Sequence, residues 1–306
     1  MSLISTLSKS LTLTRLLIRY VENWPDVLKT ALMNRRTRNV KVIFKGCGQL
    51  FFKDLFTLYQ LLTLLEKGWN IKDCYDDGTI LLCKEVCLKV RTRKGYDIGH
   101  VDEIYEKQVY GSNFSGVVID IGASNADSSI FFAIKGAQKV IALEPFPESY
   151  ELGKFNVEVN DLTNKVILLP YALADHDGIT EFNISADNPN ANSINPSEYI
   201  KESGVAFDGK IRVQTVTLTT IMYKYDINRI ELLKMDCEGC EYTVLRNLPG
   251  DVLDAVDKII LEYHNYPREI PSILQKSGFK VKYEEKPTGI LVAQRPIEPS
   301  PYQEEC

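Results

Sequence analysis

The fold is decided by one stretch, Val117-Val118-Ile119-Asp120-Ile121-Gly122-Ala123-Ser124-Asn125-Ala126. Its first residues form a short apolar run, which ends in an acid and a glycine. A continuous apolar run of this length indicates a strand that is buried on both faces of a parallel sheet. The small residues after it predict a turn in which a ligand can approach the backbone, and a helix is expected over Asp127 to Lys135.

The same strand and helix rhythm continues along the chain. Strands that alternate with helices predict βαβ units and a parallel sheet. Further parallel strands are expected at 139–144, 166–169, 232–236 and 258–262, extra antiparallel strands at 179–184 and 211–216, and closing strands near 279–283 and 289–293. The sequence therefore predicts an α/β fold, a doubly wound and mostly parallel sheet, over residues 111–295.

Residues 1–110 are expected to form a small α+β appendage, and residues 296–306 a flexible tail. Residues 1–116 carry 18 Lys and Arg against 12 Asp and Glu, whereas the rest of the chain carries 18 against 29. This excess of positive charge in residues 1–116 could contact an anionic partner, but it also fits simple attraction to the acidic rest of the chain. The Leu-rich helix expected near the start has its apolar residues at helical spacing. We expect it to pack on the body, with peripheral contact to a membrane surface as the alternative.

The seven cysteines are irregularly spaced and odd in number, which argues against a secreted disulfide framework. Cys237 and Cys240 form one CxxC, and no second CxxC completes a zinc site, so no metal is predicted and the pair is expected to pack in a tight loop. The N-terminal Leu-rich stretch is interrupted by basic residues and is too short to span a bilayer. A cytoplasmic protein is therefore expected.

A nucleoside site is expected at the carboxyl ends of the first two strands. Glu144 follows Asp120 at nearly the offset at which an acid accepts hydrogen bonds from ribose hydroxyls. The turn at Gly122 lacks the later glycines that a pyrophosphate requires. Asp120 would also repel a pyrophosphate, but it suits a cationic ligand such as a sulfonium. These features favour S-adenosylmethionine over a dinucleotide.

A second group of ionisable residues lies at the ends of two later strands. Asp236 and Glu238 follow one strand, and Glu262 and His264 end the next. Methyl transfer to a hydroxyl requires removal of a proton, which a carboxylate or imidazole can accept. Helix capping or a structural histidine are the alternatives, and the spacing fixes no metal geometry.

The polar segment between the two antiparallel extra strands, residues 185–209, is rich in Asn, Ser, Pro and Gly. A loop of this length inside a compact domain is typical of a lid or binding loop. We expect the part around Asn190, Asn192 and Ser193 to fold over the acceptor.

The chain resembles the FkbM family of methyltransferases from about Asp97 to Ala293. The most specific match is Leu232-Leu233-Lys234-Met235-Asp236-Cys237-Glu238-Gly239-Cys240-Glu241, which carries the family's lysine, aspartate, glutamate, glycine and glutamate. Further matches are Val118-Ile119-Asp120-Ile121-Gly122-Ala123, Leu143-Glu144-Pro145, Ala172-Leu173-Ala174-Asp175 and Leu261-Glu262-Tyr263-His264. The chain departs from the family at Ser124 and Ala126, where Asn and Gly are usual, and at Thr219, where Asp is usual.

The resemblance implies a class I methyltransferase sheet of seven strands and O-methylation by S-adenosylmethionine, with Ala172 near the adenine. The predicted cofactor site comprises Asp120, Gly122, Ala123, Ser124, Glu144, Pro145 and Ala172. The predicted catalytic residues are Asp236, Glu238 and His264, and the predicted acceptor contacts are Asn192, Ser193 and Glu262.

The predicted acceptor is a hydroxyl of a sugar, a glycan or a small natural product. One alternative is an RNA methyltransferase that uses the basic N-terminal part as a phosphate clamp. The chain lacks the Asn-Pro-Pro-aromatic motif for a flipped base, so nucleic acid is not the expected partner. The other alternative is a non-catalytic protein with the same fold.

Overall fold

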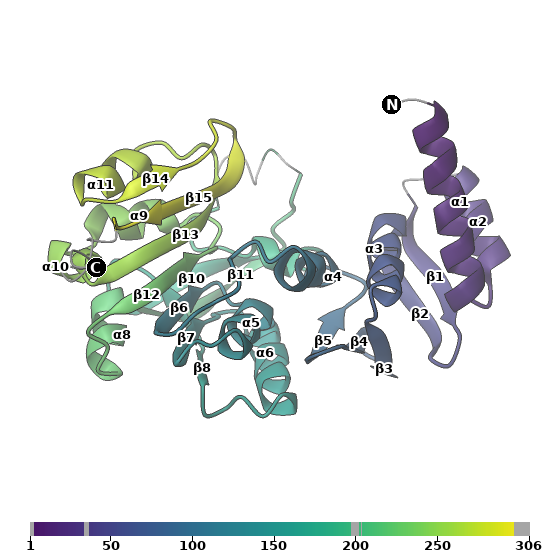
Figure 1. Cartoon of the computed structure of the whole chain (residues 1–306), viewed down its shortest axis with the longest axis horizontal. Coiled ribbons are helices and arrows are strands. Elements are labelled where there is room, and N and C mark those ends of the chain that lie inside the picture. Colours follow the sequence, from purple (N-terminus) through teal and green to yellow (C-terminus); the bar gives the residue numbers. More distant parts are fainter. Residues whose placement is uncertain (1–2, 34–36, 197–201, 203, 297–306) are drawn as a thin grey trace, which may run out of the picture.

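The computed structural model describes residues 3–33, 37–196, 202 and 204–296 (Figure 1). Its largest sheet has seven strands, in spatial order β14 (Lys280–Lys282), β15 (Thr288–Gln294), β13 (Val256–His264), β12 (Ile230–Met235), β6 (Val117–Ile121), β7 (Lys139–Leu143) and β8 (Val166–Leu169). The run from β13 to β8 is parallel, and only the pairs that involve β15 are antiparallel. The predicted doubly wound methyltransferase-type sheet is confirmed. Its strand order reverses at β6 and β12, where open α/β sheets bind their ligands.

Successive residues of the central strands face opposite sides of this sheet, as the pleat requires. On β6 and β12, Val118 and Leu232 enter one hydrophobic cluster, while Ile119 and Leu233 enter another. The first cluster is covered by α5 (Asp127–Ile134) and α6 (Pro147–Val159). The second is covered by α8 (Leu218–Lys224), α9 (Cys240–Asn247), α10 (Gly250–Asp254) and α11 (Ile270–Lys276). Burial on both faces explains why these strands are continuous apolar runs.

A smaller sheet lies beside the carboxyl ends of the central strands. β10 (Gly178–Ile184) and β11 (Gly209–Val216) pair antiparallel, as predicted, and β11 also pairs parallel with the unexpected strand β9 (Tyr171–Leu173). The connection between β10 and β11 contains a 3-10 turn, η2 (Pro189–Ala191). Within this connection, residues 197–201 and 203 lie outside the described residues.

The N-terminal part forms the end of the molecule that carries α1 and α2 in Figure 1. Its elements are α1 (Leu3–Tyr20), α2 (Trp24–Met33), β1 (Arg38–Phe44), β2 (Gly48–Asp54), α3 (Leu55–Glu66), β3 (Asn70–Cys74), β4 (Thr79–Cys83), β5 (Cys87–Arg91), α4 (Asp97–Val101) and a π-helical turn η1 (Asp102–Glu106). Leu16 and Leu17 of α1 are buried in the same cluster as Leu61 of α3 and Phe131 of α5. The first helix therefore packs on the body along its described face. Because one core runs across residue 110, the domain boundary there stays a prediction, and the predicted tail lies outside the described residues beyond residue 296.

Six of the seven cysteines form disulfides, namely Cys47–Cys74, Cys83–Cys87 and Cys237–Cys240. The expectation from their spacing was wrong, because pairing depends on which elements the fold brings together. The first pair joins the β1–β2 turn to β3, the second joins adjacent ends of β4 and β5, and the third closes the loop before α9. Among the described residues, no helix combines the length and the apolar character that crossing a bilayer demands.

Candidate functional site

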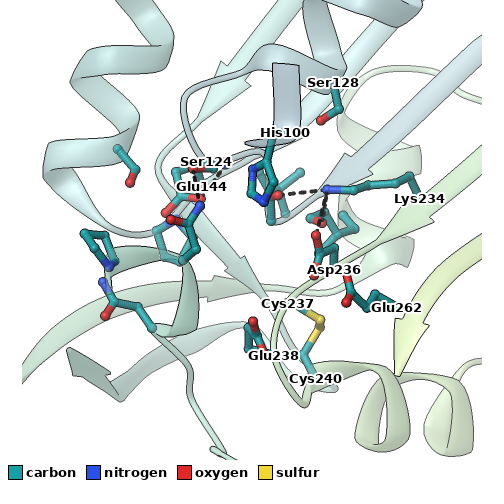
Figure 2. Close-up of a pocket in the computed structure, with 18 of the residues that line it drawn as sticks. His100, Ser124, Ser128, Glu144, Lys234, Asp236, Cys237, Glu238, Cys240 and Glu262 are labelled. Carbon is teal, nitrogen blue, oxygen red and sulfur yellow. Dashed lines mark hydrogen bonds and ion pairs between the residues drawn. A yellow bond between two sulfur atoms is a disulfide. The ribbon is translucent and has the colours of Figure 1, made fainter. Parts of the chain in front are cut away.

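A cavity of about 260 Å³ opens at the carboxyl ends of β6, β7, β12 and β13. Ten of the thirteen predicted site residues line it: Gly122, Ser124, Glu144, Pro145, Ala172, Asn192, Asp236, Glu238, Glu262 and His264. Asp120, Ala123 and Ser193 do not line it and are fully buried. The side chains labelled in Figure 2 come from the strand ends and from the helices α4, α5 and α9, and they lie around the cavity.

The loop after β6 forms one wall. Gly122 has a φ of +73°, and a Cβ there would collide with the carbonyl oxygen of Asp236. The amides of Gly122 and Ala123 both donate to the carbonyl oxygen of Leu143 at 3.0 Å, which fixes the loop to the end of β7. Glycine is therefore required at position 122 both for backbone conformation and for space. This loop, residues 122–126, is the predicted cofactor loop, and these contacts hold it at the strand ends.

Glu144 is anchored beside this loop. Its Oε2 accepts from the Ser124 amide and its Oε1 from the Phe146 amide, each at 2.8 Å. Burial raises the pKa of Glu144 to about 7, although these two bonds and Arg91 oppose the shift. Each carboxylate oxygen keeps lone pairs for a second donor. The group is thus placed to accept hydrogen bonds from the paired hydroxyls of a ribose.

Asp120 does not face the cavity, contrary to its predicted contact with a cationic ligand. It points to the face of the sheet that α5 covers, where its Oδ2 accepts from Ser128 and Ser129 and its Oδ1 lies 3.2 Å from Lys234 Nζ. The physical reason is that Ser128 and Ser129 of α5 and Lys234, its register partner on β12, already engage the Asp120 carboxylate. Asp120 therefore acts on the site through its ion pair with Lys234.

Lys234 was not predicted as a site residue, although it lines the cavity. Its Nζ donates to the Gly122 carbonyl oxygen at 2.9 Å and lies 3.8 Å from Asp236 Oδ2. Burial opposes its charge, but Asp120 above all raises its pKa, so it remains a cation. The signal was available in the sequence, because Lys234 and Asp236 are two residues apart in the strand predicted over 232–236, where they would share a face.

Arg91 of β5 links the N-terminal part to the cofactor loop. It forms a bidentate pair with buried Asp97, at 2.9 and 2.8 Å, and donates to the hydroxyls of Ser149 and Ser124 at 3.1 and 3.3 Å. The residue is itself almost fully buried. The loop that carries Ser124 is therefore braced by a residue outside the predicted methyltransferase domain.

The ends of β12 and β13 bring four ionisable side chains together. His264 Nδ1 lies 3.2 Å from Glu238 Oε2, and its Nε2 lies 3.5 Å from Glu262 Oε1. Burial opposes the charge of His264, but the bond with Glu262 and the nearby carboxylates raise its pKa to about 10. Burial raises the pKa of Glu238 to about 8 and also raises that of Asp236. Burial opposes the ionisation of Glu262, but His264 lowers its pKa, so at neutral pH an imidazolium lies beside an ionised Glu262 and a mostly protonated Glu238.

The β10–β11 connection supplies the opposite wall. Asn192 lines the cavity, and its Oδ1 accepts from the Ser185 amide at 2.7 Å while its Nδ2 is buried without a partner among the described residues. Asn190 also lines the cavity. Ser193 lies behind the wall and donates to the carbonyl oxygen of Glu238 at 2.7 Å. Ser193 therefore positions Glu238 instead of contacting an acceptor directly.

The segment before β6 contributes side chains that sequence reasoning missed. Tyr96, His100, Glu103 and Tyr110 all line the cavity. His100 Nδ1 lies 3.8 Å from Asp127 Oδ2, a buried atom without a hydrogen-bond partner among the described residues, and burial raises the pKa of Asp127 to about 6. No local pattern marks these residues, because their position depends on long-range packing. In the described part of the chain, no group of three or more His, Cys, Asp or Glu side chains could hold a metal ion.

Comparison with known proteins gives a family match. The model of the family described as "Methyltransferase FkbM domain" matches residues 120–281. A curated relative, "Methyltransferase sdnD" of Sordaria araneosa, is 25% identical over 190 residues, which covers 54% of this chain and 73% of the relative.

Two solved structures with a similar fold share little sequence with this chain. The precorrin-6y C5,15-methyltransferase of Geobacter metallireducens is 13% identical, with a TM-score of 0.38, and the match covers 72% of this chain and 96% of that chain. TrmK of M. capricolum, in complex with S-adenosyl-homocysteine, is 12% identical, with a TM-score of 0.35, and the match covers 62% of this chain and 66% of that chain.

Proposed function

Because the chain belongs to the family of methyltransferases that carry the FkbM domain, we propose that it methylates a hydroxyl group of a sugar, a glycan or a small natural product. The chain is an S-adenosylmethionine-dependent methyltransferase. The oxygen acceptor is the proposed part, and it rests on the cluster of Asp236, Glu238, Glu262 and His264 at the cavity.

The residues on one side of the cavity fit the cofactor. Glu144 offers a buried carboxylate at the end of β7, and Ala172 leaves room for a flat ring beside it. Asp127 Oδ2 and Asn192 Nδ2 are buried polar atoms in the cavity wall that lack a hydrogen-bond partner among the described residues. Such atoms are costly unless a ligand satisfies them. S-adenosylmethionine supplies an electrophilic methyl group when it is bound there.

The other side of the cavity suits a polyhydroxyl acceptor. In our proposal Asp236 accepts the proton of the attacking hydroxyl, and Lys234, 3.8 Å away, stabilises the carboxylate. Glu238 and Glu262 flank His264 and present oxygens to neighbouring hydroxyls of the same acceptor. Carboxylates accept and imidazolium donates, so the group matches the mixed donors and acceptors of a sugar ring.

Two further parts of the proposal concern the surroundings of the protein. We propose that the segment with Asn190 and Asn192 covers the bound acceptor. A cytoplasmic location remains our proposal from the N-terminal sequence. An oxidising compartment is the alternative, and the three disulfides favour it.

The test is transfer of an isotopically labelled methyl group from S-adenosylmethionine to fractions of a cell extract, followed by identification of the labelled product. The proposal predicts a methyl ether whose formation is lost in Asp236→Asn and retained in Glu181→Gln. Glu181 serves as the control because it is exposed on β10, outside the cavity. A label found on nitrogen or carbon would contradict the hydroxyl acceptor.

A further inference from the structure

A disulfide forms part of the acceptor wall. Cys237 and Cys240 both line the cavity, and their bond encloses Glu238 in a short covalent ring (Figure 2). The other two disulfides do not line the cavity. The Cys237–Cys240 bond is thus directly linked to a residue of the proposed acceptor site.

Glu238 has a backbone conformation that needs support. Its φ is +57°, which is unfavourable for a residue with a side chain. Two noncovalent constraints act on the ring: Ser193 donates to the Glu238 carbonyl oxygen, and Glu241 accepts from the amides of Cys237 and Gly239 at 2.8 Å. The disulfide is the only covalent constraint within this ring that a cell can open and close.

The two sulfurs differ in environment. Cys237 is half-buried in the cavity wall, whereas Cys240 is buried at the first residue of α9. A thiolate that leaves from Cys240 would be stabilised by the amide end of that helix. An approaching thiol therefore has an accessible target at Cys237 and a favourable leaving group at Cys240.

We propose that Cys237–Cys240 is a redox modification site, at which reduction by a dithiol loosens Glu238 and slows methyl transfer. The effect on transfer rests on the proposed function, whereas the effect on the loop does not. The site needs no cofactor beyond the dithiol.

The reaction is ordinary thiol–disulfide exchange. A thiolate of the dithiol attacks Cys237 Sγ, forms a mixed disulfide and breaks the bond to Cys240, which leaves as a thiolate and takes up a proton. The second thiol of the reductant then displaces Cys237, so the reductant becomes a cyclic disulfide and the protein gains two electrons and two protons. In the disulfide-bonded structure Cys237 Sγ lies 3.2 Å from Glu241 Oε1, to which the thiol formed by reduction can donate.

The experiment compares three forms of the full chain: the wild type, Cys237→Ser/Cys240→Ser, and the control Cys47→Ser/Cys74→Ser, whose disulfide lies in the N-terminal part. Each is equilibrated in dithiothreitol buffers of graded redox potential, and free thiols are trapped with a maleimide and located by peptide mass spectrometry. Binding of S-adenosylhomocysteine, which depends on Glu144 and not on the disulfide, verifies that each variant is folded.

Two readouts follow the change. The first is methyl transfer to the acceptor identified by labelling. The second is the NMR titration of His264, one of only three histidines in the chain, assigned with His264→Gln. On reduction we expect transfer to slow several-fold and the pKa of His264 to fall, because Glu238 no longer stays beside it. The control variant should respond like the wild type, and Cys237→Ser/Cys240→Ser should resemble the reduced wild type in any buffer.

The proposal is overturned if Cys237 and Cys240 remain oxidised when Cys47 and Cys74 are reduced, or if their reduction leaves the His264 titration unchanged. If reduction changes the His264 titration but no hydroxyl acceptor is found, the redox site is supported and only the proposed function is contradicted. A response that is lost in the control variant would assign the effect to the N-terminal disulfide and overturn the proposal.

Discussion

Lys234 and Asp120 are register partners on adjacent parallel strands, and their side chains form an ion pair of 3.2 Å that is closed to solvent. The pair connects the sheet to the cofactor loop, because Lys234 also donates to the Gly122 carbonyl oxygen. Lys234, which matches the lysine of the family motif, thus holds this loop in place.

Removal of one partner of this pair should be costly. We predict that Lys234→Met lowers the free energy of unfolding by about 3–5 kcal/mol, because it leaves the Asp120 charge buried and unpaired. Lys234→Met/Asp120→Asn should recover much of the loss. The measurement is urea unfolding, with Lys210→Met as the control, whose exposed pair with Glu181 should be worth less than about 1 kcal/mol. Equal losses in the two single variants would contradict the buried pair.

Substitution of Gly122 tests whether the loop after β6 binds the cofactor, and Gly46 provides a closely matched control. Gly122 and Gly46 have nearly the same φ, +73° and +78°, but a Cβ at Gly46 meets open space while one at Gly122 meets the Asp236 carbonyl. Gly46→Ala should therefore cost only the backbone strain of about 1–2 kcal/mol. We predict that Gly122→Ala costs clearly more in urea unfolding and abolishes calorimetric binding of S-adenosylhomocysteine. Retained binding in Gly122→Ala would mean that this loop does not hold the cofactor.

We expect Arg91 to give the N-terminal part a role in cofactor binding. Arg91→Lys keeps the charge but loses the planar fork that reaches Asp97 and Ser124 together. We predict a loss of roughly tenfold in affinity for S-adenosylhomocysteine, which corresponds to about one charge-assisted hydrogen bond. Arg93→Lys, two residues along on an exposed side chain, should leave the affinity unchanged. If both variants bind like the wild type, the brace on Ser124 does not act on the cofactor.

Glu238 predicts a pH dependence of turnover. Its pKa is raised to about 8, so the carboxylate is mostly protonated at neutral pH and becomes ionised as the pH rises through that value. If the ionised form accepts hydrogen bonds from the acceptor, kcat/KM should increase across that range. The rate should fall again only near the pKa of His264, about 10. The pH profile of Glu238→Gln should lack the lower limb, and an unaltered lower limb in that variant would assign the titration to another group.

Much of the sheet was predictable because its signal is local. The apolar runs of β6, β7, β12 and β13 are buried on both faces, so they look alike in the sequence whatever their neighbours. The acids that end them were expected to converge, since parallel strands finish at one edge, and Glu144, Asp236, Glu238 and Glu262 do line one cavity. The short elements β9 and α10 were missed because three to five residues carry too little periodicity.

The orientation of single side chains was harder to predict. Asp120 was expected to face the ligand, but its carboxylate is engaged by Lys234 and by two serine hydroxyls of α5. His100 and Tyr110 reach the cavity only because the N-terminal part packs beside the sheet, and no local pattern records that packing. The disulfides likewise depend on spatial neighbours and not on spacing in the sequence.

The most direct measurement is calorimetric titration of S-adenosylhomocysteine into the wild type, Glu144→Ala and the control Glu181→Ala over a range of pH. Because ionised Glu144 accepts from ribose hydroxyls more strongly than protonated Glu144, wild-type affinity should be constant above its pKa of about 7 and decline as the pH falls below it. Glu144→Ala should bind more weakly by about 1–3 kcal/mol at high pH and lose that decline, while Glu181→Ala should match the wild type. Unchanged affinity in Glu144→Ala would contradict the assignment of this cavity as the cofactor site.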